Sequence, residues 1–97
     1  MPKLALYVHL KAKPGKEAEV EAFLAQGARM AKDESDTVSW YALKEDTGLY
    51  SIFDTFDDDV GREAHLNGPI AKALMAKAGE LLAEPPHIHR IKLIAAK

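Results

Sequence analysis

The sequence predicts an α+β protein in which one antiparallel sheet carries its helices on a single face. Segments with strand-like alternation lie at both ends and in the middle of the chain, and segments with helical spacing lie between them. A polar loop ending in glycine joins the two central strand segments, which predicts a hairpin. With 97 residues and no internal break, the chain is expected to form one domain over residues 1–97.

The first strand is expected over residues 4–11. Leu4, Leu6, Val8 and Leu10 alternate with a mixed set of residues, and this period of two places the sets on opposite faces of a sheet. The aliphatic set is expected to lie under helices, and the mixed set to face another subunit.

A helix is expected from Lys16 to about Lys32, after the break at Lys13-Pro14-Gly15. Apolar residues recur there at helical spacing, and three glutamates near its start complement the helix dipole. The acidic segment 33–36 has no apolar periodicity and is predicted to be a loop.

Two further strands are expected over residues 37–44 and 49–56, both rich in β-branched and aromatic residues. They flank Glu45-Asp46-Thr47-Gly48, where glycine supplies the positive φ that such loops often need. The two strands are therefore predicted to be antiparallel neighbours.

A short helix follows, and its three aspartates at 57–59 are interpreted as helix capping rather than as a metal site, because hard cations need more oxygen ligands than one turn offers. Thr55-x-x-Asp58 resembles a capping box, with Asp57 as the expected N-cap. Asn67-Gly68 is predicted to end this helix.

A second helix is expected from Pro69 until just before Pro85-Pro86, and a last strand over residues 87–95. The resulting βαββαβ order, with the second helix broken, is that of a ferredoxin-like fold. One sheet face would stay open, and pairing two such faces across a two-fold axis predicts a homodimer.

Composition excludes several classes of function. The net charge is only −2, with both signs interspersed, so a nucleic-acid partner is not expected. The absence of cysteine removes disulfides, thiolate metal sites and thiol nucleophiles. No apolar run approaches the roughly 20 residues of a membrane helix, so we expect no membrane association and a cytoplasmic location.

Several residues in order resemble the antibiotic biosynthesis monooxygenase family, also called quinol monooxygenase-like proteins. They are the opening strand with Lys13-Pro14-Gly15-Lys16, Asp54-x-Phe56 at the end of the third strand, and Ala64-His65-Leu66 followed by Gly68-Pro69. The resemblance covers nearly the whole chain and implies a dimeric α+β barrel.

The chain departs from the family pattern at two points. Family members commonly have Glu-x-Trp where this chain has Asp54-x-Phe56, and haem-degrading relatives have an asparagine where this chain has Val8. Haem degradation is therefore not expected, and haem binding through His65 is only a third possibility.

The resemblance implies that His65 and Asp54 are the catalytic residues and that they face a pocket beneath the helices. Histidine suits a general base or proton shuttle, and Asp54 could orient it. Six further side chains are predicted to contact a planar ligand: Ile52, Phe53, Phe56, Trp40, Tyr41 and Met75.

Simpler interpretations remain for each of these residues. His65 would also be favoured in the last turn of a helix by the dipole, and Asp54 could bond loop amides. Trp40 and Phe53 are often core or dimer contacts, and Met75 could be core filler.

His87-x-His89 places two imidazoles on one strand face, a spacing that can suit a metal. No third ligand is evident in the sequence, although His9 could approach across the sheet. A solvated or interface pair is the simpler interpretation, and no metal is assigned.

The leading hypothesis is a cofactor-independent monooxygenase that oxidises a small aromatic phenol or quinol with O₂, with no cofactor of its own. The alternative is a non-catalytic dimeric module that binds a small ligand or another protein.

Overall fold

The computed structural model describes residues 1–97 and contains four strands and three helices. In chain order they are β1 (Leu4–Lys11), α1 (Glu17–Ala31), β2 (Thr37–Asp46), β3 (Leu49–Phe56), α2 (Asp59–Leu66), α3 (Pro69–Leu81) and β4 (His87–Lys92). The predicted order is confirmed, with α2 and α3 as the two parts of the broken helix.

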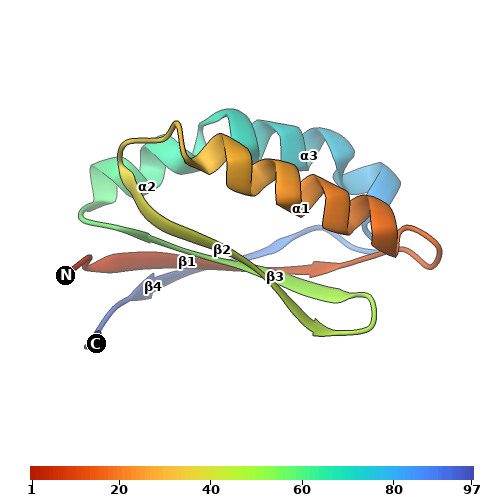
Figure 1. The fold of residues 1–97 in the computed structure, drawn as a ribbon, viewed down its shortest axis with the longest axis horizontal. Coiled ribbons are helices and arrows are strands. Elements are labelled where there is room, and N and C mark those ends of the chain that lie inside the picture. Colours follow the sequence, from red (N-terminus) through yellow and green to blue (C-terminus); the bar gives the residue numbers. More distant parts are fainter.

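The four strands form one antiparallel sheet in the order β2-β3-β1-β4. All three helices lie on the same face of this sheet, and the other face is bare (Figure 1). The predicted ferredoxin-like α+β architecture is therefore confirmed. The two central strands, β1 and β3, lie beneath the helices.

The core lies between the helices and the helix-facing residues of the central strands. Alternation places Leu6, Val8 and Leu10 of β1 beside Ile52 and its neighbours of β3, and all are buried. The helices contribute buried aliphatic residues to the same layer: Val20, Leu24, Ile70, Leu74 and Leu81.

The open face carries a row of rings that crosses all four strands. Tyr41 of β2, Phe53 of β3, Tyr7 of β1 and His89 of β4 are successive cross-strand partners. Tyr41 is exposed, as are the neighbouring Leu43 and Leu49. This face has the composition expected of an interface, and the dimer remains a prediction.

The N-cap of α2 differs from the predicted one. Asp58, not Asp57, has the extended backbone of an N-cap, and its side chain accepts a hydrogen bond from Gly61 N at 2.9 Å. The predicted capping box is also wrong, because Thr55 lies within β3 and its hydroxyl is 2.6 Å from that of Ser39. Pairing with β2 holds Thr55 in the sheet, so the helix begins later.

The ends of two strands, β2 and β4, also differ slightly from their predicted positions. β2 continues to Asp46, which pairs with Leu49, so the predicted four-residue loop shortens to a tight turn in which Gly48 has φ +74°. β4 ends at Lys92 rather than Ala95, because Lys92 already pairs with Leu4, the first residue of β1. A single backbone hydrogen bond follows, from Leu93 N to Lys3 O at 2.9 Å, and the ladder does not continue.

A glycine in α1 makes room for the tryptophan of β2. A Cβ atom built on Gly27 would lie 3.0 Å from Trp40 Cη2, so the indole packs directly against the backbone of the helix. Trp40 thereby joins the edge of the core.

None of the three helices is long and apolar enough to cross a membrane.

Candidate functional site

Asp54 is a carboxylate inside the apolar layer. It lies on the helix-facing side of β3 with Tyr50, Ile52 and Phe56, as the period of two predicts, and its side chain is only 1 % exposed. A buried carboxylate is costly unless it is paired and hydrogen-bonded. The partner of Asp54 is His65.

Helix α2 brings His65 back over the end of β3. The chain reverses after Phe56, the N-cap starts the helix, and His65 lies in its last turn with 8 % of its side chain exposed. Its Nε2 is 2.9 Å from Asp54 Oδ2, and its ring packs against Phe56 with 5.4 Å between centroids. The predicted meeting of Asp54, Phe56 and His65 is therefore present in the structure.

The second nitrogen of His65 contacts a residue that the sequence did not reveal. Glu34, in the loop after α1, places Oε1 2.5 Å from His65 Nδ1. The same oxygen accepts a hydrogen bond from the Thr37 hydroxyl at 2.9 Å. The imidazole therefore lies between two carboxylates, and Asp54, His65 and Glu34 form what we call the carboxylate–histidine line.

The two carboxylates favour the charged imidazolium. Burial by itself lowers the pKa of His65, but the hydrogen bonds to Asp54 and Glu34 and their negative charges outweigh it, so that its pKa is raised above the ordinary value. With both nitrogens donating, the ring has no free lone pair. His65 is therefore held in its protonated form and is not free to act as a general base.

Asp54 and Glu34 each have one carboxylate oxygen that does not contact His65. Asp54 Oδ1 and Glu34 Oε2 are buried and have no hydrogen-bond partner. Two carboxylates around one imidazolium also leave a net charge of about −1. The line therefore has the capacity to accept a further hydrogen-bond donor.

Two hollows meet at Glu34. One, of about 220 Å³, lies between the 33–37 loop and the α2–α3 junction and includes His65 among its lining residues. The other, of about 540 Å³, lies between the end of α1 and β2 and has Trp40 as its aromatic wall. Glu34, Ser35 and Thr37 line both.

The predicted closed pocket beneath the helices is not found. Larger hollows on the helix side lie at its edge, between α1 and β2, whereas the space between α1 and α3, beside Leu10, Val20, Phe23 and Leu74, measures only about 10 Å³. That is about the space of one water molecule. Aliphatic side chains fill this layer, so any ligand of the carboxylate–histidine line approaches from the Glu34 side.

The predicted ligand-binding residues do not all surround one cavity. Trp40 lies near Glu34, and Ile52 and Phe56 lie in the buried layer. Tyr41 and Phe53 point to the open face of the sheet, and Met75 is 59 % exposed on α3. For these last three residues, the expectation of a shared pocket with His65 is wrong, because strand alternation and the helix phase turn them away.

Glu34 could not be found by periodicity, because it lies in an irregular acidic loop 31 residues before His65. The only signal was an acidic cluster directly before a strand.

Haem ligation through His65 would require breaking one of its two carboxylate hydrogen bonds. No group of three or more potential ligands is already arranged around a metal position.

A comparison with solved structures identifies the family. The NE2512 protein of unknown function from Nitrosomonas europaea is 52% identical, with a TM-score of 0.97, over 100% of this chain and 94% of that one. The chain belongs to the NE2512 family. This membership does not supply an activity, because NE2512 is itself of unknown function.

More distant structures share the fold. A "putative antibiotic biosynthesis monooxygenase" from Caulobacter crescentus CB15 is 21% identical, with a TM-score of 0.83 over 97% of this chain and 92% of that one. Another so described, from Nitrosomonas europaea, is 12% identical, with a TM-score of 0.85 over 95% and 99% of the two chains. The resemblance seen in the sequence is thus confirmed in the fold.

No protein-family model matches the chain, and neither does any curated protein.

Proposed function

We propose that this member of the NE2512 family is a cofactor-independent monooxygenase that oxidises a small phenol or quinol with O₂. The observation that carries the proposal is the carboxylate–histidine line, which ends at Glu34 between two hollows. The monooxygenase-like fold supports it, and Trp40 offers an aromatic surface on which a planar ring can stack.

Glu34 is the base in this proposal, and His65 is the proton shuttle behind it. Since His65 already donates from both nitrogens, the substrate hydroxyl gives its proton to Glu34, which lines both hollows. The His65 ring contacts Glu34 Oε1 through Nδ1, and Asp54 holds the ring in place through Nε2.

The substrate supplies all the electrons. The phenolate transfers electrons to O₂, one oxygen atom replaces a ring hydrogen, and the other leaves as water. For a hydroquinone the balanced outcome is a hydroxyquinone and one water per O₂ consumed, and no external reductant is needed.

Oxygen uptake with a panel of small hydroquinones tests this proposal. We expect uptake above buffer, and we expect Glu34→Gln to lower kcat by about 100-fold or more, the scale of general acid–base catalysis. Glu19→Gln, an exposed glutamate on α1, is the matched control and should retain full activity. No uptake by the wild type, or full activity in Glu34→Gln, contradicts the proposal.

The second candidate is a non-catalytic dimeric module that binds a small ligand. The specific observation in its favour is the filled apolar layer between α1 and α3, where only about 10 Å³ is free. Native mass spectrometry distinguishes the two: a small molecule retained by the purified protein, without turnover in the oxygen assay, favours the module.

A further inference from the structure

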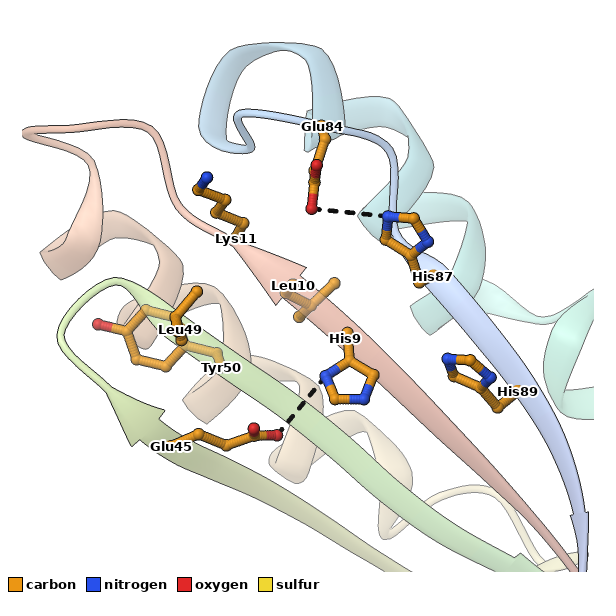
Figure 2. Close-up of a pocket in the computed structure, with 9 residues that line it drawn as sticks. All are labelled: His9, Leu10, Lys11, Glu45, Leu49, Tyr50, Glu84, His87 and His89. Carbon is orange, nitrogen blue, oxygen red and sulfur yellow. Dashed lines mark ion pairs between the residues drawn. The ribbon is translucent and has the colours of Figure 1, made fainter.

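Three of the four histidines lie together on the open face, away from the carboxylate–histidine line. His87 and His89 are two residues apart on β4 and therefore project from the same face. His9 on β1 is the direct cross-strand partner of His87, so it projects from that face too. Figure 2 shows the three imidazoles above the neighbouring strands.

The three rings are close but do not yet converge. The His9 and His89 rings are 5.5 Å apart between centroids and meet edge to face. His9 Nδ1 turns toward Glu45 at 3.7 Å, and His87 Nε2 toward Glu84 at 3.5 Å. The side chains of His9 and His87 are 42% and 60% exposed in the single chain, so their side-chain torsions can change before two copies pair through this face.

This donor set suits a divalent transition metal. Three imidazoles are the protein ligands of a known class of zinc site, which keeps a fourth position open. Imidazole nitrogen suits Zn²⁺, Cu²⁺ and Ni²⁺, whereas Mg²⁺ and Ca²⁺ prefer oxygen ligands. The third ligand is His9 of the neighbouring strand, whose approach across the sheet the sequence had left open.

The surroundings favour a cation. The Glu45 carboxylate lies 3.7 Å from His9 Nδ1 and accepts a hydrogen bond from the Tyr7 hydroxyl. Glu84 lies beside His87 on the other side. A hollow of about 290 Å³ lies between these groups, with Lys11 as the one cationic side chain in its lining. It leaves room for a fourth ligand such as water.

We propose that His9, His87 and His89 bind one divalent transition-metal ion of the zinc class on the open face of the sheet. The site is independent of the proposed oxygenation, because it lies on the opposite face from His65. Glu45 is the nearest protein carboxylate available to a metal held by His9.

Titration with Co²⁺ tests the proposal on the full chain, expressed without a histidine tag and treated with chelator. We expect visible absorption bands that saturate at one Co²⁺ per chain and disappear when Zn²⁺ is added. His9→Gln, His87→Gln and His89→Gln should each weaken binding by more than about 10-fold, since even outer-shell changes cost that much.

Two controls retain the three proposed ligands. His65→Gln removes the fourth histidine, and Lys72→Gln removes an exposed charge on α3, so both should bind Co²⁺ like the wild type. Circular dichroism verifies that each variant is folded. No saturable binding by the wild type, unchanged binding in His9→Gln, or one metal per two chains would overturn the site.

Discussion

At the scale of single residues, Asp54 and Glu34 are tolerable near the core because they share a cation. Each carboxylate has one oxygen against the His65 ring, and the ring is held in position from both sides. Removing one member of a buried charged set leaves the others uncompensated, which is usually more damaging than losing the pair as a whole. The line should therefore contribute to stability as well as to chemistry.

The contribution of His65 to stability should depend on pH. Its pKa is raised in the folded protein, so the stabilisation is fully present below the unfolded-state value near 6.5 and is lost as the pH rises through the folded-state value. We expect the free energy of unfolding of the wild type, relative to His65→Gln, to decrease as the pH rises above about 6.5, the ordinary value for histidine. Urea denaturation of both proteins with chelator present measures it.

His87→Gln is the matched control for that experiment, because His87 is exposed and distant from buried carboxylates. A pH dependence that this variant shares with His65→Gln is not specific to the carboxylate–histidine line. A wild-type advantage over His65→Gln that grows toward pH 9 would contradict the assignment of His65 as an imidazolium.

Part of this site could be predicted from sequence and part could not. Asp54 and Phe56 follow from the alternation of a regular strand, and His65 follows from a helix that must return over it. Glu34 depends on where α1 ends and on how a loop without periodicity crosses to β2. Its role arises only from tertiary packing.

At the scale of elements, the start of α2 depends on one aspartate. Asp58 caps the helix by accepting the Gly61 amide, whereas Asp57 is exposed and makes no such bond. We expect Asp58→Ala to lower the free energy of unfolding by about 1 kcal/mol, the usual value of an N-cap. Asp57→Ala should change it by less than about 0.5 kcal/mol. Equal losses in thermal or urea unfolding would refute the assigned cap.

Two helical glycines should respond differently to alanine. A Cβ at Gly79 of α3 meets nothing within 4 Å, so Gly79→Ala should stabilise the protein by up to about 1 kcal/mol through helix propensity. At Gly27 the same Cβ would lie 3.0 Å from the Trp40 ring, so the gain should be lost. Urea denaturation of both variants measures the change in the free energy of unfolding. An equal increase in Gly27→Ala would mean that the indole of Trp40 shifts freely.

Element boundaries were predictable where the chain itself marks them. β3 matches its predicted range of 49–56, since Gly48 precedes it and acidic residues follow. The end of β4 was not, because Leu93 and Ile94 continue the apolar composition, although β1 begins at Leu4 and a single backbone hydrogen bond, from Leu93 to Lys3, follows the ladder. Alternation predicts a strand but cannot show whether a neighbour is present.

At the scale of the whole molecule, the two faces of the sheet differ in what covers them: one is packed under helices and the other is open. Between α1 and α3 the helix face is packed so closely that only about 10 Å³ is free, which depends on the fit of individual side chains and could not be predicted from their order. The open face leaves Tyr41, Leu43 and Leu49 exposed together with the half-buried Phe53. Exposed apolar groups gathered on one face are typical of an interaction site.

We predict that two copies of the chain pair through this open face. In a two-fold arrangement each substitution acts twice, and a carboxylate placed there would be desolvated without a partner. Leu43→Glu should therefore shift the protein from about twice its monomer mass of 10.6 kDa to the monomer mass in sedimentation velocity. Val60→Glu is the matched control, because Val60 is 76% exposed on α2, on the helix side of the sheet, and should leave the mass unchanged. A wild-type monomer at high concentration, or a dimer that persists in Leu43→Glu and dissociates in Val60→Glu, would place the interface elsewhere.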